Sequence, residues 1–411
     1  MQTKQALIIL LLCGTHLLKA QMPGSKTLSL PDATALAKSN NALIKVQQLR
    51  IKEADLLVGT AKALPKTGFS AEIGQLNTRA LDFKFGVSQA FKHPDYYKAQ
   101  EQLRKAEAEA VLPYAKLTEK ELRNQVSRCF YRLVYLQNHK QSLLQFDSLY
   151  QIHLTNTSKQ VKLGEATVIE QLSAEALVNE NKNLLEQLKL VTYEAQTEWK
   201  YYLQSDAWYL PPTNTPLPSL DTTQTWENIW QNHPELAIQT SNNRVLEANT
   251  KATKTGVLPE FTAGYTLQSI TGTHSFAGTD YEYNKLPQFS VFQLGMQLPI
   301  SSKSYKKQVE ASQIKQQINE QLTSLRGLQL KKDWELSQIA FLRAKANLEY
   351  QKSTLLTQSN RLVSIAERSR KLGEIGHSEW MTYTLQAYKL QQSYLTALED
   401  YLNTYQMVIS F

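Results

Sequence analysis

The spacing of hydrophobic residues changes along each half of the chain and predicts its elements. Apolar residues alternate with polar or small ones at residues 69–74 and 81–88, and again at 261–268 and 292–298. A period of two is typical of β-strands with one apolar and one polar face. Two strands are therefore expected in each half, following the Leu-Pro pairs at 64–65 and 258–259.

Long segments without any strand or loop signal predict helices. Tyr96 to Leu163 is one such segment, and within it the apolar residues Leu122, Val126, Cys129, Leu133 and Leu136 follow the four-three spacing of a coiled-coil seam. A helix of that length spans roughly 100 Å, and Pro113 is expected to kink it. Returning helices are predicted at about 166–203 and 378–407, and shorter helices within 27–63 and at about 225–256.

The chain is a duplication. Lys162-Leu163-Gly164-Glu165 recurs as Lys371-Leu372-Gly373-Glu374, 209 residues later, and the same offset pairs Phe83 with Phe292, Tyr96 with Tyr305 and Glu170 with Glu379. Glycine permits the positive φ that turns a helix back on itself, so each copy is expected to be a helical hairpin with its tip at Gly164 or Gly373. The expected division is a first repeat at 21–210, a proline-rich linker at 211–219 and a second repeat at 220–411.

The N-terminus is typical of a secretory signal peptide at residues 1–20. Lys4 precedes an apolar run at 6–12, and Ala20 is a small residue at the expected cleavage site. Lipidation of Cys13 is less favoured, because Leu12 stands where a small residue is expected. Cleavage leaves Cys129 as the last cysteine, expected to be a buried helix residue without a disulfide partner.

Composition and charge narrow the function. The 411 residues carry a net charge of +8, but Lys and Arg alternate with Glu throughout, which argues against nucleic-acid binding. No stretch approaches 18 consecutive apolar residues, so any membrane role falls to the strands. Strands of this kind also occur in half-buried hairpins on the core of a soluble protein. Because the chain is expected to be exported, we favour the other interpretation, that they are strands of an outer-membrane barrel, whose dimensions they match.

Four strands cannot close a barrel by themselves. Lipid tolerates no open sheet edge, and the smallest bacterial barrels have about eight strands, so four strands per chain require assembly. A trimer would provide twelve strands, whereas a dimer would provide eight and fill its interior with side chains.

A signal peptide is followed by two copies of the order helix, strand pair, long helix, glycine tip and returning helix. This order resembles the TolC-like outer-membrane efflux family over the mature chain. The two Leu-Pro junctions and the two tips carry the resemblance best, and segments 90–97 and 373–380 resemble the branch that serves heavy-metal cation pumps. The resemblance implies an α+β membrane protein: a homotrimer with a 12-stranded transmembrane β-barrel in the outer membrane, continued by a long periplasmic α-helical barrel. Its implied partners are a periplasmic adaptor (membrane fusion protein) and an inner-membrane pump of the RND type.

Three sets of candidate functional residues follow. Alternation places six apolar residues toward lipid and Lys84, Thr262 and Gln293 toward the lumen; the six are Phe83, Phe85, Phe261, Tyr265, Phe292 and Leu294. Leu163 and Leu372, beside the tip glycines Gly164 and Gly373, are candidates for adaptor docking, with a local cap contact as the alternative. The resemblance implies that Glu170 and Glu379 form an acidic ring at the periplasmic entrance, against the alternative of solvated outer-face charges.

The sequence contains no catalytic pattern. Its histidines are not spaced as metal ligands for one another and are expected at the surface or along a tunnel, and no phosphate-binding loop or nucleophile elbow is present. No enzyme activity, cofactor or metal is therefore predicted.

Two hypotheses remain: an outer-membrane exit duct, and a periplasmic coiled-coil adaptor or structural protein that binds partners through its tips. The four amphipathic strands favour the duct.

Overall fold

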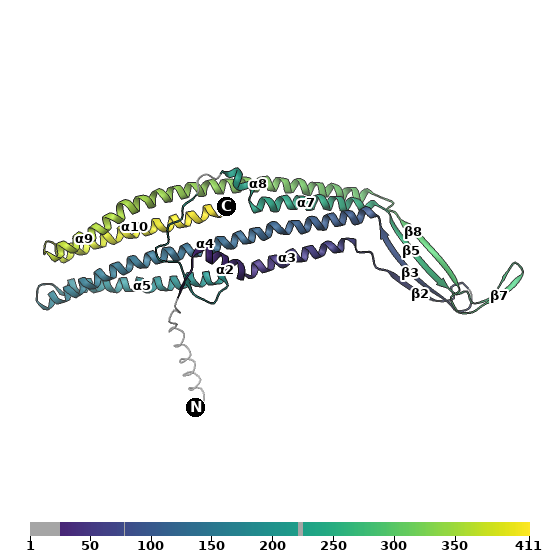
Figure 1. Ribbon diagram of the computed structural model, residues 1–411, viewed down its shortest axis with the longest axis horizontal. Helices are drawn as coiled ribbons and strands as arrows, with labels where there is room; N and C mark the ends of the chain where they lie inside the picture. The colour runs from purple at the N-terminus through teal and green to yellow at the C-terminus, as the bar shows by residue number, and fades with distance from the viewer. Residues whose placement is uncertain (1–24, 78, 221–224) are drawn as a thin grey trace, which may run out of the picture. The chain divides into compact units, whose positions relative to one another are not determined.

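The computed structural model describes residues 25–77, 79–220 and 225–411 (Figure 1). The predicted signal peptide at 1–20 lies outside the described residues. The chain divides into two compact units, and each draws segments from both repeats. The hairpin unit contains Thr118–Ile229, Gln329–Phe411 and the chain up to Lys45, and the sheet unit contains Val46–Leu117 and Trp230–Leu328. The two units do not coincide with the two predicted repeats, because each unit combines segments of both. The repeat boundaries at 21–210 and 220–411 therefore stay a prediction.

The hairpin unit contains the two predicted helical hairpins. The first is formed by the C-terminal part of α4 (Pro94–Lys162) and by α5 (Val168–Leu203). The second is formed by the end of α8 (Lys303–Tyr350), a π-helix η3 (Gln351–Leu355), α9 (Leu356–Lys371) and α10 (His377–Ile409). The predicted helices are confirmed to within a few residues.

Helix α4 continues through Pro113, because one lost hydrogen bond does not end a helix of 69 residues, and the kink expected there stays a prediction. A further irregularity, which the sequence did not predict, lies in the second copy, where η3 separates α8 from α9. A π-helix of this kind inserts one residue into the turn and leaves no pattern of polar and apolar positions that predicts it.

Two clusters of buried residues hold the hairpin unit together, and the larger one joins both hairpins. Trp199 of α5 is buried and packs edge-on against Phe130 of α4, with ring centroids 5.9 Å apart. Leu133 of α4 and Leu398 of α10 belong to the same cluster. Cys129 is buried, as predicted, and burial raises the pKa of its thiol to about 12, so this side chain is a core residue and not a nucleophile.

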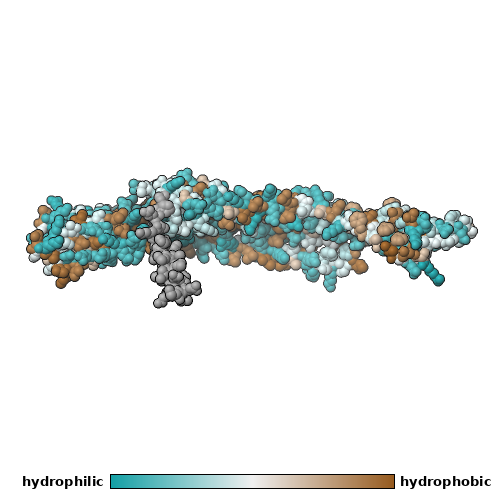
Figure 2. Space-filling view, turned by 90° about the horizontal axis from the view of Figure 1, so that it is seen from below, coloured by the Kyte–Doolittle hydropathy of each residue, from teal (hydrophilic) through white to brown (hydrophobic). Residues whose placement is uncertain are grey.

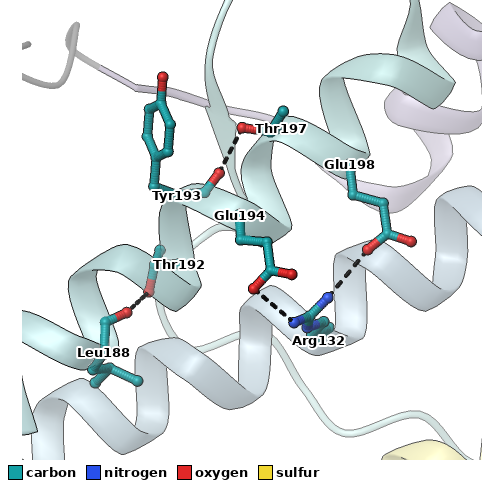
Figure 3. Close-up of polar contacts among 7 residues, drawn as sticks. All are labelled: Arg132, Leu188, Thr192, Tyr193, Glu194, Thr197 and Glu198. Atoms are coloured by element: carbon teal, nitrogen blue, oxygen red, sulfur yellow. Dashed lines mark hydrogen bonds and ion pairs between the residues drawn. The ribbon is translucent and has the colours of Figure 1, made fainter. Parts of the chain in front are cut away.

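Polar contacts join the helices of the first hairpin at its surface. Arg132 of α4 forms ion pairs with Glu198 and Glu194 of α5, with N···O distances of 3.1 and 3.6 Å (Figure 3). These side chains are exposed, so each pair contributes at most about 1 kcal/mol. Register between the two helices therefore depends on the buried core more than on these charges.

Short helices at the start of each repeat are broken where one longer helix was expected. In the first repeat, α2 (Leu30–Asn40) is capped by Ser29 and followed by α3 (Ala42–Val58) and a 3₁₀ turn, η1 (Gly59–Lys62). In the second, α6 (Trp226–Gln231) precedes α7 (Pro234–Lys254) and η2 (Thr255–Val257). A proline at the first position of α7 explains the second break, because proline suits a helix start but not its interior.

The sheet unit carries a four-stranded antiparallel sheet in the order β2-β3-β5-β8 (Figure 1). Its strands are β2 (Gly68–Gly74), β3 (Asp82–Lys92), β5 (Glu260–Gln268) and β8 (Phe289–Gln297). All four predicted strands are confirmed. The segment between β5 and β8 contains a further hairpin of β6 (Gly272–Phe276) and β7 (Thr279–Tyr283), which the sequence did not predict.

The β6–β7 turn has a local cause. Ala277 and Gly278 both have positive φ, 49° and 82°, as a two-residue hairpin turn requires.

In the hairpin unit, β1 (Lys26–Thr27) pairs in parallel with β4 (Tyr209–Leu210). Among the described residues we find no helix with both the length and the apolarity needed to cross a membrane.

Candidate functional site at the hairpin tips and the sheet

The two hairpin tips share one backbone geometry. At the first tip, the N–H of Gly164 donates to the carbonyl of Val161 and that of Glu165 donates to the carbonyl of Gln160, at 3.1 and 2.8 Å. The equivalent bonds at the second tip join Gly373 to Arg370 and Glu374 to Ser369, at 3.2 and 2.9 Å. Both glycines have positive φ, 74° and 76°, so each helix ends in a Schellman motif as the repeated tetrapeptide predicted.

Both tips present apolar side chains to solvent. Leu163 is 72% exposed and Leu372 is 63% exposed, so neither is covered by a local cap contact. At the first tip, Val168, Ile169 and Leu172 are also exposed, which the sequence analysis did not note. The close spacing of these three apolar residues at the start of α5 could have indicated an exposed apolar patch beside the tip. Figure 2 shows hydrophobic residues at the surface of this end of the hairpin unit. The docking role of Leu163, Gly164, Leu372 and Gly373 stays a prediction.

Glu170 and Glu379 each cap the helix that follows their tip. The N–H of Thr167 donates to the carboxylate of Glu170 at 2.8 Å, and the N–H of Gly376 donates to that of Glu379 at 3.0 Å. Bonds from the backbone N–H of Thr167 lower the pKa of Glu170. Recurrence at the 209-residue offset thus has a local reason, because each glutamate accepts the N–H of the N-cap residue three positions before it. Thr167 completes a capping box at the first tip, whereas Gly376 has no side chain to return the bond.

The capping role is compatible with an entrance ring. A capping carboxylate accepts one or two hydrogen bonds and keeps its negative charge, and Glu170 also interacts electrostatically with His377 and Arg370 of the second hairpin. The structure therefore brings the first carboxylate close to the second hairpin. Whether both carboxylates line a tunnel stays a prediction.

Several histidines correct the expectation of exposed positions. His153, His233 and His377 are buried. His233 accepts a hydrogen bond from the N–H of Glu235 at the start of α7, at 3.2 Å, and therefore caps that helix. The sequence did not predict the burial of His153 and His377, because it arises from packing between the two hairpins. Among the described residues, no group of three or more His, Cys, Asp or Glu side chains could hold a metal ion.

Strand register sorts the sheet residues into two faces. Phe85 lies opposite Leu267, Tyr265 opposite Phe292, and Ala263 opposite Leu294. Residues opposite each other in neighbouring strands share a face, so all six predicted lipid-facing residues lie on one side of the sheet: Phe83, Phe85, Phe261, Tyr265, Phe292 and Leu294. Lys84, Thr262 and Gln293 lie on the other side.

The apolar face of the sheet is exposed in the single chain. Phe292 and Leu294 are 82% and 89% exposed, and Phe69, Ile73 and Met296 are exposed as well. Hydrophobic residues gather over the sheet in the space-filling view (Figure 2). A soluble sheet would cover such a face with helices or a second sheet, so this face requires another environment or partner.

The opposite face carries paired charges. Lys84 and Glu72, directly opposite each other in β3 and β2, form an ion pair at 3.0 Å, and Lys92 of β3 pairs with Glu260 of β5. Strands β2 and β8 form the two edges of this sheet within the described chain. Their outward N–H and C=O groups are available for pairing with further strands.

Comparison with known proteins gives structural matches alone. No family model and no curated protein matches the sequence. A membrane protein from Pseudomonas aeruginosa is 13% identical, with a TM-score of 0.76 over 93% of this chain and 92% of that one. The CmeC outer membrane channel of Campylobacter jejuni is 12% identical, with a TM-score of 0.73 over 93% and 84% of the two chains.

A third solved structure agrees. CusC, whose structures concern folding and transmembrane channel formation, is 14% identical, with a TM-score of 0.74 over 95% of this chain and 94% of that one. Sequence identities this low establish the fold alone, which here extends over nearly the whole of both chains. The chain therefore has the fold of the TolC-like outer-membrane efflux proteins, the family that its two repeats resemble.

Proposed function

We propose that this protein is the outer-membrane exit duct of a tripartite efflux system, with no enzymatic activity of its own. The observation that supports this most is the sheet, whose apolar face is exposed while its polar face carries the ion pairs. Lipid around the apolar face and water along the polar face would satisfy both. Structural similarity to a protein described as an outer membrane channel supports the same function.

Closure of a barrel requires further copies of the chain. Each neighbouring pair in the order β2-β3-β5-β8 is antiparallel, so β8 of one copy would also run antiparallel to β2 of the next. Three copies would provide twelve strands and leave a water-filled interior, whereas two would provide eight strands whose side chains fill the barrel. We therefore propose a homotrimer with a 12-stranded transmembrane β-barrel.

An exposed apolar stripe on α8 supports assembly through the helices. Ile314, Ile318, Leu322 and Leu325 recur at helical spacing and are each more than half exposed. A stripe of this kind is covered by another helix in water. We propose that a helix of the next copy covers it, which would extend the barrel into a periplasmic α-helical tube of coiled-coil hairpins.

The proposed partners follow from the two ends of the duct. The sheet would lie in outer-membrane lipid, and the tips at Gly164 and Gly373 would contact a periplasmic adaptor that links the duct to an inner-membrane pump, of the RND type by resemblance. Heavy-metal cations are the cargo that segments 90–97 and 373–380 suggest. Loss of the gene should then increase sensitivity to heavy-metal salts more than to organic dyes.

The test of this proposal is the cellular location of the chain and its oligomeric state. Outer-membrane extraction should yield a trimer that migrates as one species on unheated gels and as a monomer after boiling. Recovery of a soluble periplasmic monomer would refute the duct and favour the second candidate, a coiled-coil adaptor that binds partners through its exposed tips.

A further inference from the structure

Two buried histidines join the hairpins near their tips. His153 of α4, in the first hairpin, is 5% exposed, and His377 at the start of α10, in the second, is 6% exposed. Their Nε2 and Nδ1 atoms are 2.8 Å apart, and their rings stack with centroids 4.6 Å apart. The two residues are 224 positions apart, so the contact is purely tertiary.

The surroundings of the pair hold it in place from both hairpins. The ring of Trp380 stacks on His153 with centroids 3.8 Å apart and donates its indole N–H to Glu367 at 3.0 Å. Arg370 of α9 donates to the side-chain oxygen of Gln160 on α4 at 3.0 Å. The imidazole pair and the Arg370–Gln160 bond thus connect the same two hairpins near the tips, with His153 about three helical turns from Gly164.

The contact depends on the charge of the imidazoles. One neutral ring donates an N–H and the other accepts it with a lone pair. A first added proton places a charge in a buried contact close to Arg370. A second proton turns both facing nitrogens into donors, and the bond is lost.

We propose that the His153–His377 contact is an acid-sensitive junction between the two hairpins. While both rings are neutral, their hydrogen bond and stacking hold the hairpins together. When acid protonates the rings, charge repulsion and the cost of burying the charge separate the hairpins at this level.

Charged groups on α4, α5 and α9 surround the junction. On α9, Arg370 lies close enough to disfavour protonation of both rings, while Glu367 is bonded to Trp380. Glu170 of α5 favours protonation of both rings but is half-buried and already bonded to Thr167. On α4 and α9, Lys159 and Lys371 line the adjoining pocket and add positive charge.

The direction of the pH effect follows from burial. Burial, with smaller effects of His377 and Arg370, lowers the pKa of His153 from 6.5 to about 3, and burial also lowers the pKa of His377. The separated state binds protons more readily than the joined state, so the junction is stable above about pH 6.5 and weakens as the pH falls. Each unit of pH below that value shifts the equilibrium by up to about tenfold per histidine.

Hydrogen exchange of the purified full-length protein tests the junction. Protection factors, corrected for the intrinsic pH dependence of exchange, are measured for peptides covering 150–160 and 370–384. Between about pH 7.5 and about pH 5.5, wild-type protection should fall by at least about tenfold. The double variant His153→Gln with His377→Gln keeps two neutral polar groups and should show no such fall.

His139→Gln is the matched control. His139 is also on α4 and burial lowers its pKa too, but its ring contacts Tyr135 and no second histidine, so this variant should behave as wild type. If the double variant does not fold, His377→Gln alone should halve the slope of log protection against pH. Equal loss of protection in wild type and in the double variant (or, where only the single variant folds, in His377→Gln), or constant wild-type protection down to about pH 4.5, would overturn the proposal.

The His153–His377 junction does not depend on the proposed duct function. Its expected effect on conductance does rest on that proposed function. If the tips close the entrance of the duct, acid on the tip side should raise single-channel conductance in wild type and not in the double variant. Acid-dependent exchange without any channel activity in bilayers would leave the junction in place and count against the duct.

Discussion

Replacing Phe292 with arginine should prevent assembly of the protein in the outer membrane. Phe292 lies within β8, on the apolar face, opposite Tyr265 and with its ring centroid 4.9 Å from that of Tyr265. Because Phe292 is 82% exposed, its side chain extends away from the sheet and not into a core. In the proposed trimer it faces hydrocarbon, where a guanidinium finds neither water nor a counter-ion.

The size of the effect can be worked out per copy. An arginine on the lipid face near the bilayer midplane costs about 2 to 4 kcal/mol. Loss of the ring contact with Tyr265 adds about 0.5 to 1.5 kcal/mol. Three copies in one barrel together lose about 8 to 16 kcal/mol, which is comparable with the whole net stability of a folded protein, about 5 to 15 kcal/mol.

The assay is the yield of heat-modifiable trimer after outer-membrane extraction, compared with the total amount of chain. Gln293→Arg is the matched control, because it places the same side chain one residue later on the polar face. Phe292→Leu is the second control, since it removes the aromatic contact but stays apolar. Trimer should be lost in Phe292→Arg alone.

Two outcomes would refute this reasoning. Normal trimer in Phe292→Arg with loss in Gln293→Arg would mean that the apolar face lines the interior. Normal trimer in both variants would mean that β8 does not lie in the membrane, and the sheet would then need another partner for its apolar face.

The remaining predictions concern the tips. Replacing both Leu163 and Leu372 with aspartate should abolish efflux-dependent resistance and adaptor cross-linking without lowering trimer yield, since both side chains are exposed; unchanged cross-linking would exclude a docking role. Replacing Glu170 and Glu379 with glutamine keeps a capping side chain but removes the charge, and should reduce cation selectivity and divalent block in planar bilayers. A divalent cation about 6 Å from one carboxylate gains about 1.4 kcal/mol in water before salt screening, so several carboxylates in one zone give a measurable effect. Equal selectivity and block in both proteins would place these carboxylates outside the tunnel.

Much of the fold could be predicted because its determinants are local. Alternation at 81–88 and 292–298 predicted both the strands and their two faces, since a strand turns successive side chains to opposite sides. Repetition of Leu-Gly-Glu at a fixed offset predicted both tips, because the Schellman turn needs a positive φ that glycine adopts without strain. The capping function of Glu170 and Glu379 was equally local, and the spacing of three residues from Thr167 and Gly376 was the signal for it.

Tertiary packing alone decided the rest. The π-helix at Gln351–Leu355 breaks the second hairpin where the sequence keeps an ordinary helical composition. His153 and His377 have no counterparts at the 209-residue offset, so the duplication could not pair them. Their contact exists because two hairpins from different repeats pack side by side, and burial in that packing, not residue type or spacing, changes what the two imidazoles can do.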